Sequence, residues 1–433
     1  MYTRTTGIIA GCALVLCSCP ASAWQINYSL EMALGYSDNI NQSETTPKSE
    51  TLLIPRVNFD ASEEGEALRA HAVGQVEYRD YLRGVYGNEV RGQLSGVATW
   101  IILPKRLSFD FEDYAAVQPV NILAANTPAN QQQTNVFTLG PTFNFRLWQT
   151  LNGLAELRFT SSTASETKEF NSTRVMGAIR AVKELSPLDT LSANFEGHKV
   201  HFTDRSGGPD YELVEGYGRY TSKLTQLDLD FTAGYSRVHF PDASDHSALI
   251  GRGLVTWRAT PNNTFAASFQ RRFADASQDI ILDDPAMIVA NALGTGVVVG
   301  STAVTSEVYL EKRVQASYAF QSERYHLRVD PYYRNLDYLV DPTLDQQAHG
   351  VIGGISYRPR PLWTLAFDAA EETRTFNSLA RRDEDWRLDL SFTDQFARQW
   401  SVRFDLIRNE RNSDAVGQSY RENLAFATLI FKR

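Results

Sequence analysis

Residues 227–235 read LDLDFTAGY, an alternation of apolar or small residues with polar or small ones. In an extended strand, successive side chains point to opposite faces. Leu229, Phe231 and Tyr235 therefore share one face, and the two aspartates share the other. Similar alternation recurs from Trp24 to Arg433 without a continuous apolar segment. A whole chain of such segments is typical of a closed sheet that has one face in lipid and the other in water.

The N-terminal residues have the features of a secretory signal. Arg4 supplies the positive charge, a short apolar core follows, and Ala21–Ala23 forms a small-residue cleavage motif. We therefore expect a signal peptide at 1–23 and a mature chain at 24–433. An alternative is a lipoprotein signal with Cys19 as the lipidated residue, although the cysteine two positions earlier fits that pattern poorly.

Composition excludes several classes of protein. All three cysteines lie in the expected signal, so the mature chain has no disulfide and no thiolate metal site. Loss of Arg4 changes the formal charge from −9 to 41 − 51 = −10, which disfavours binding to nucleic acid. Mean hydropathy is negative, which rules out helical membrane spans. No linker divides the chain, so one continuous architecture is expected.

Two kinds of break alternate along the chain. Tight turns are expected at 63–66, 103–105, 147–149, 186–189, 224–226, 261–263, 322–324, 359–361 and 397–399. Longer polar loops are expected at 39–49, 83–88, 118–133, 164–170, 204–210, 241–245, 274–306, 341–347, 377–385 and 412–419. Short periplasmic turns that alternate with long external loops are typical of bacterial outer-membrane barrels. The sequence therefore predicts an all-β, transmembrane antiparallel β-barrel of about twenty strands, with eighteen as the alternative.

Two further features support insertion into the outer membrane. Tryptophans beside tight turns are expected to form the periplasmic aromatic girdle against outer-membrane lipid: Trp100, Trp148, Trp257, Trp363 and Trp400. The last segment alternates and carries Phe431 near its end, which resembles the signal read by the barrel assembly machinery. In that signal the aromatic is usually the final residue, whereas Lys432 and Arg433 follow here.

Charged residues within the strands are expected to face the lumen, because a charge on the lipid face near the midplane costs roughly 2–4 kcal/mol. The lumen-facing candidates are Glu112, Glu156, Arg158, Asp228, Asp230, Arg313, Arg328, Asp330, Arg387, Asp389, Arg403 and Asp405. They could pair with one another and stiffen the wall, or they could line a path for a hydrated substrate. A barrel of this size leaves an aqueous lumen unless something plugs it.

No pattern in the chain indicates catalysis. His198 and His201 are three residues apart, so a strand would place them on opposite faces, where they cannot share a metal ion. No nucleophile elbow, Walker loop or dinucleotide fingerprint is present. We expect no enzyme activity, no cofactor and no metal.

Residues 274–306 form the largest insertion. Its apolar clusters at 280–282, 287–289 and 297–299 are unusual for an exposed loop. They are expected to pack into the barrel mouth as a constriction, or else on each other. The first strand begins almost at Trp24, so no N-terminal plug domain is expected.

The start of the mature chain carries a resemblance to a known family. Residues 32–40 read MALGYSDNI, and residues 52–57 read LLIPRV after a polar loop. This resembles outer-membrane β-barrel proteins of exopolysaccharide and exosortase (PEP-CTERM) gene clusters. The resemblance implies a role in polysaccharide secretion at the outer membrane, with the secreted polymer and periplasmic export components as partners. A general porin for small solutes and a structural or adhesion barrel acting through its external loops are the alternatives.

Overall fold

The computed structural model describes residues 24–204, 208–282 and 303–433, which form twenty antiparallel strands. The strands are β1 (Gln25–Ser37), β2 (Glu50–Glu64), β3 (Leu68–Tyr81), β4 (Glu89–Leu103), β5 (Leu107–Pro119), β6 (Gln131–Arg146), β7 (Leu151–Ala164), β8 (Ser172–Glu184), β9 (Asp189–Phe202), β10 (Tyr211–Lys223), β11 (Leu227–His239), β12 (His246–Thr260), β13 (Asn263–Ala274), β14 (Tyr309–Gln321), β15 (Tyr325–Tyr338), β16 (Gln346–Arg360), β17 (Trp363–Phe376), β18 (Arg381–Asp394), β19 (Trp400–Ser413) and β20 (Tyr420–Lys432). The expected signal peptide, and with it Cys19, lies outside the described residues.

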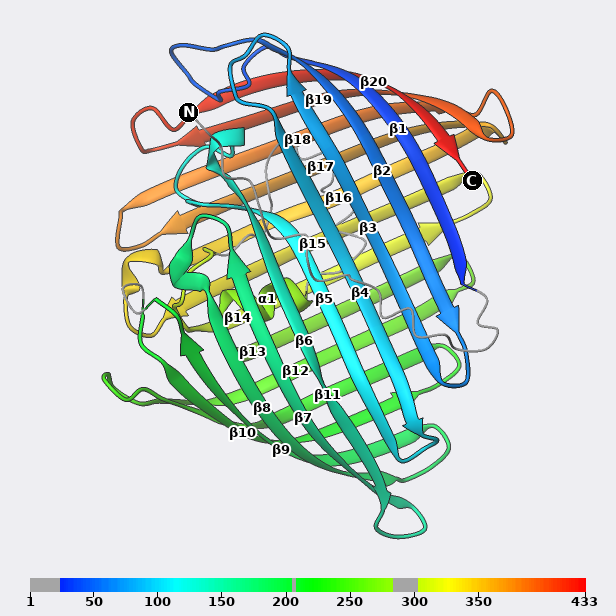
Figure 1. Ribbon diagram of the computed structural model, residues 1–433, viewed down its shortest axis with the longest axis vertical. Helices are drawn as coiled ribbons and strands as arrows, with labels where there is room; N and C mark the ends of the chain where they lie inside the picture. Colours follow the sequence, from blue (N-terminus) through cyan, green and yellow to red (C-terminus); the bar gives the residue numbers. More distant parts are fainter. Residues whose placement is uncertain (1–23, 205–207, 283–302) are drawn as a thin grey trace.

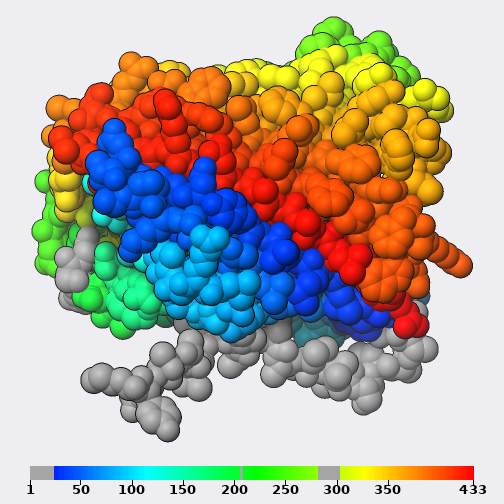
Figure 2. Space-filling model, turned by 90° about the horizontal axis from the view of Figure 1, so that it is seen from above, coloured from blue at the N-terminus to red at the C-terminus, as the bar shows by residue number. Residues whose placement is uncertain are grey.

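The sheet closes on itself. Each strand pairs with its neighbours in the chain, and β1 pairs with β20 from Ser29 opposite Lys432 to Ser37 opposite Leu424. Beyond this ladder, Tyr28 and Arg433 exchange backbone hydrogen bonds of 2.9 and 3.0 Å. Figure 2 shows β20 in red beside β1 in blue. Closure leaves the described strands without an unpaired edge, which is what a sheet in lipid requires.

The predicted strand number is confirmed, and the turns lie where they were expected. Five of the ten predicted loops had a boundary wrong by two or more residues. The loop predicted at 118–133 spans 120–130, the loop predicted at 274–306 ends at 308, and the loop predicted at 341–347 ends at 345 because β16 begins at Gln346. The loop predicted at 377–385 ends at 380, because β18 begins at Arg381. The loop predicted at 412–419 begins at 414, because β19 continues to Ser413. The start of β18 alternates between buried Asp383 and Asp385 and the more exposed residues between them. Residues 381–385 were predicted as a loop because they are charged. In the structure they belong to a strand, and their inward charges are paired inside the barrel.

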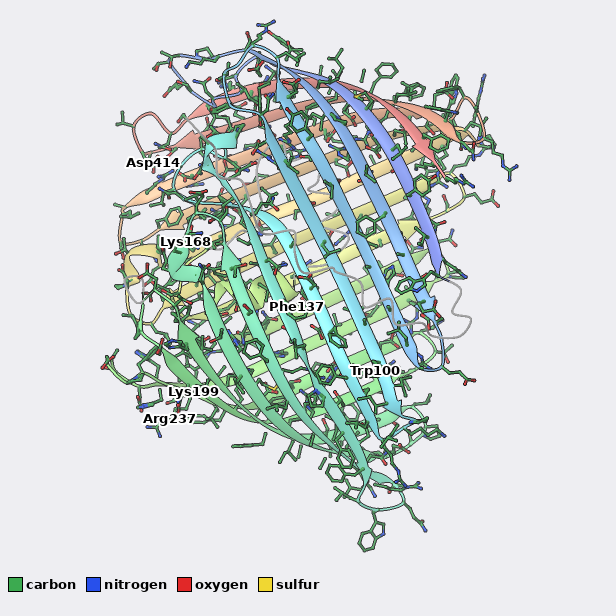
Figure 3. The ribbon with its side chains drawn as sticks, in the orientation of Figure 1. Trp100, Phe137, Lys168, Lys199, Arg237 and Asp414 are labelled. Atoms are coloured by element: carbon green, nitrogen blue, oxygen red, sulfur yellow. The ribbon has the colours of Figure 1, made fainter. Side chains whose placement is uncertain are left out.

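The outer surface carries a belt of apolar side chains. On β1, Leu30, Met32 and Leu34 are 46%, 47% and 53% exposed, whereas Ala33 between them is 1% exposed. Figure 3 places Phe137 midway along the barrel, Trp100 towards the end with the tight turns, and charged residues such as Lys199 and Arg237 at the end with the long loops. The predicted tryptophans Trp100, Trp148, Trp257 and Trp400 are all exposed near tight turns, and Trp363 opens β17 beside another.

Among the described residues, helical structure is confined to the loops. These helices are α1 (Ala276–Leu282), η1 (Pro128–Asn130), η2 (Lys168–Phe170) and η4 (Pro342–Leu344). Within the described ranges, no helix is long and apolar enough to cross a membrane. Figure 1 shows α1 inside the ring of strands. The closed sheet and its apolar belt make the chain a transmembrane β-barrel, and α1 lies in its lumen (Figure 1).

Candidate functional site in the barrel lumen

Lumen-facing side chains differ sharply in exposure between the two ends of the barrel. Near the tight turns, the side chains of Asp60 and His71 are 53% and 55% exposed, although they lie 3.3 Å apart. Near the long loops, the side chains of Glu77 and Arg79 are 3% and 2% exposed. The lumen is therefore filled towards the loop end and open to water towards the turn end.

The loop between β13 and β14 fills part of the outer half. Its first anchor is Asp275, which accepts hydrogen bonds from the Tyr211 hydroxyl (2.6 Å) and the Ser277 hydroxyl (2.8 Å) and pairs with Arg174 on β8. Burial alone would raise the pKa of Asp275, but the charge of Arg174 and these hydroxyl donors hold the pKa below its usual value. Asp275 is therefore a carboxylate clamped by the wall.

The second anchor is Asp279, one helical turn further along α1. It contacts Arg272 on β13 at 2.9 Å, Arg334 on β15 at 2.5 Å and the hydroxyl of Tyr309 at 2.6 Å. Here too burial would raise the pKa of Asp279, and the two arginines lower it below its usual value. Glu311 on β14 bonds both arginines as well, at 3.0 and 2.8 Å. Two acids and two arginines thus form one buried cluster.

Apolar residues of the same loop contact a different arc of the wall. Ala276, Ile280 and Val304 are 2%, 4% and 3% exposed. They pack against Tyr114 of β5, Val136 of β6, Ala164 of β7 and Phe170 of η2. Because β8 to β12 separate this arc from β13–β15, the loop bridges two distant parts of the barrel wall. We call residues 275–282 and 303–308 the plug.

A second loop folds inward beside the plug. Residues 120–130, between β5 and β6, place Ile122 against Phe376 of β17 and Ala303 of the plug. Arg411 of β19 donates a hydrogen bond of 3.2 Å to the carbonyl oxygen of Ala124. The two loops therefore meet inside the barrel, in its outer half.

The twelve predicted lumen residues lie on the lumen-facing side of their strands, and eight of them pair with each other. The pairs are Glu156 with Arg158 (3.6 Å), Arg328 with Asp330 (2.5 Å), Arg387 with Asp389 (3.3 Å) and Arg403 with Asp405 (2.9 Å). Each of these pairs joins residues two apart on one strand. These eight residues are therefore paired, whereas stiffening of the wall by the pairs stays a prediction.

The other four predicted residues contact partners that were not predicted. Asp228 pairs with Arg258 at 2.6 Å, and Asp230 pairs with Arg219 at 2.5 Å. Arg313 donates a hydrogen bond of 3.0 Å to Gln315, and Glu112 accepts one from the Tyr114 hydroxyl. A path for substrate along these residues stays a prediction.

Sequence reasoning missed the residues that anchor the plug. A signal for the loop side existed: Asp275 and Asp279 are four residues apart, a spacing that places both carboxylates on one face of a helix. The wall arginines gave no signal of their own. Of the predicted apolar clusters, Ile280 packs on the barrel wall, while 287–289 and 297–299 lie outside the described residues.

The histidines lie as the strand pattern predicts. His198 faces the lumen 3.7 Å from Glu196, with its side chain 10% exposed, whereas His201 lies outside, 58% exposed and 2.7 Å from Asp210. In the part of the chain that the structure describes, no three His, Cys, Asp or Glu residues are close enough to hold a metal ion.

Comparisons with known proteins found structures of similar fold, but no family model and no curated protein sequence matches the chain. Among solved structures, it is similar to a mutant of the ferric enterobactin receptor PfeA from Pseudomonas aeruginosa, at 9% identity and TM-score 0.48, over 94% of this chain and 80% of that one. It is similar to the FrpB iron transporter from Neisseria meningitidis at 10% identity and TM-score 0.45, over 94% and 82%.

The copper transporter OprC shows a comparable likeness, at 9% identity and TM-score 0.46, over 95% of this chain and 80% of that one. The assignment of the architecture rests on the strand register and on the closure of the sheet. An even-numbered closed barrel with a lipid-facing belt, tight turns at one end and long loops at the other is how bacterial outer-membrane proteins are built. The chain is therefore an outer-membrane β-barrel.

Proposed function

We propose that the protein is a gated outer-membrane channel that passes exopolysaccharide out of the cell. The observation that carries the proposal is the plug: a loop of the wide barrel folds inward, and polar contacts hold it to the wall. A twenty-strand barrel without such a loop has room for an aqueous channel. Closure by a segment that can leave is the arrangement expected of a conduit that opens only in use.

The open half of the lumen supports a hydrated cargo. Its walls carry exposed ion pairs, among them Arg219 with Asp230 and Arg258 with Asp228, whose side chains are 33–48% exposed. Such groups already exchange hydrogen bonds with water, so a hydroxyl-rich polymer can replace that water at little net cost.

The motif behind the family resemblance has a structural role in this barrel. Ser37 donates a hydrogen bond of 2.7 Å to Glu422, and Asn39 donates one of 2.8 Å to the carbonyl oxygen of Arg421. Asp38 accepts bonds of 2.8 and 2.7 Å from Asn423. The motif thus fastens the end of β1 to β20, and the resemblance supports a role in polysaccharide export without contributing a binding residue.

Deletion of the gene in its native host tests the proposal. We expect the extracellular polymer to disappear and polymer to accumulate in the periplasm, with normal secretion restored by the intact gene. Purified protein in planar bilayers should be mostly closed at rest. A constant high conductance together with unchanged polymer secretion would instead identify a general porin.

A further inference from the structure

We propose that Arg174, Arg272 and Arg334 form a binding site for the carboxylates of an acidic polysaccharide, and that Asp275 and Asp279 occupy this site at rest. The inference rests on the proposed export function and adds the substrate class. In this arrangement the plug is an internal ligand, which the acidic groups of the cargo displace. The plug therefore opens when a polymer of the right charge arrives from the open half.

The charges around α1 carry the argument. The three arginines contribute +3, and Asp275, Asp279 and Glu311 contribute −3, so the charges of these six described side chains cancel with the plug in place. If the two aspartates leave with α1, the wall keeps three arginines and Glu311, which is +3 − 1 = +2. Buried charge without a partner is strongly unfavourable, so a wall left in this state requires new anions.

Other buried ion pairs of the lumen behave differently. Arg411 of β19 contacts Asp385 of β18 at 2.7 Å, and Arg79 contacts Glu77 on the same strand at 2.7 Å. Both partners in such pairs belong to the wall, so they stay neutral wherever the loops go. Among the described lumen ion pairs of strand arginines, the pairs with Asp275 and Asp279 are those in which the acid belongs to a loop. Among the described pairs, the displaceable positive charge therefore lies on β8, β13 and β15.

The donors of this site suit carboxylates. The arginine side chains are 5–8% exposed, so bound anions would be shielded from water and salt. A guanidinium presents five N–H donors in a fixed planar fork that matches a carboxylate. The hydroxyls of Tyr211 and Tyr309 add one donor to each anchor. Asp275 and Asp279 stand one helical turn apart, and a polymer with an acid on successive sugars can offer two carboxylates in the same way.

The test compares a double variant with the wild type in planar bilayers. D275N/D279N removes the two plug acids that contact Arg174, Arg272 and Arg334, and leaves the wall intact. We expect it to open, to prefer anions over cations, and to be blocked by oligogalacturonate at concentrations at least tenfold below those of a neutral maltooligosaccharide of equal length. The matched control is E212Q/D245N, which removes two acids from the outer rim, where their side chains are 47% and 33% exposed. The control should remain closed.

A second measurement needs neither conductance nor a substituted chain. In the wild type, oligogalacturonate should speed amide hydrogen exchange in residues 276–282 at least fivefold, and the neutral oligosaccharide should not. Equal effects of the two sugars, or no effect of either, would overturn the inference. An open double variant that prefers cations, or that both sugars block equally, would overturn it too while leaving a gated channel in place. A wild type that conducts freely at rest would instead count against the proposed function.

Discussion

The seating of α1 should depend on Asp279 more than on any single apolar contact. Asp279→Ala removes the shared acceptor of Arg272, Arg334 and Tyr309. Breaking a buried pair by removing one partner costs about 3–5 kcal/mol. Glu311 still bonds both arginines in the variant, so the lower end of that range applies. A loss of about 3 kcal/mol corresponds to a population of unseated α1 that is about a hundredfold larger.

Hydrogen exchange followed by mass spectrometry measures this population directly. Amides of residues 276–282 should exchange about a hundredfold faster in Asp279→Ala, while the amides of the β1–β20 ladder keep their wild-type rates. Asp245→Ala is the matched control, because Asp245 pairs with Arg237 and His239 on the outer rim. An acceleration under threefold in α1 would refute the reasoning. Equal acceleration in the ladder would show that the pair stabilises the barrel and not the seat of the plug.

Three other outcomes follow from the structure. Phe195→Arg places a charge on the lipid face, where Phe195 is 60% exposed. It should lower the free energy of unfolding in urea by about 2–4 kcal/mol. The control Ser192→Arg, which faces the lumen, should lower it much less. Burial raises the pKa of the Glu307 carboxyl from 4.5 to about 7, so the seated plug holds a proton that the unseated plug releases. Seating of the plug is then strongest at low pH and weakens as pH rises towards 7. Bilayer conductance should therefore rise between about pH 4.5 and pH 7 in the wild type, but not in Glu307→Gln. Asn130→Ala removes hydrogen bonds of 2.8 and 3.0 Å to the carbonyl oxygens of Asn121 and Ala125. It should raise both proteolysis at 120–130 and conductance. The control Asn41→Ala, in the rim loop 38–49, should raise local proteolysis alone.

Much of the barrel could be predicted from sequence because lipid imposes a rule on every residue of the wall. Within the lipid belt an outward side chain must be apolar, whereas an inward one has no such limit. Leu34 and Ala33 therefore reveal their faces by alternation alone. The rule fails where charges face inward near a loop. Arg381 and Asp383 contact each other at 2.8 Å inside the barrel, yet in sequence they look like the polar residues of an external loop.

The plug could not be predicted in the same way. A seven-residue helix has little stability of its own and forms because the wall contacts it. Arg174 and Asp275 are paired although 101 positions separate them, and Asp279 and Arg334 although 55 do. One sequence holds no record of which strands will surround a loop once the sheet has closed. The insertion at 274–306 was visible by its length and apolar content, but its anchors depend on topology.

The plug and the closure of the barrel use separate sets of contacts, and this separation allows one to change without the other. Closure depends on the β1–β20 backbone ladder and on side chains such as Ser37 and Glu422, which contact neither anchor of α1. The anchors of α1 depend on side chains of β8, β10 and β13–β15. Displacement of α1 therefore breaks two buried anchors and leaves the ladder intact. The energy required is that of the anchors, about 3–5 kcal/mol each, and not the energy of unfolding a twenty-strand sheet. A gate of that size is within reach of a ligand that supplies two carboxylates of its own.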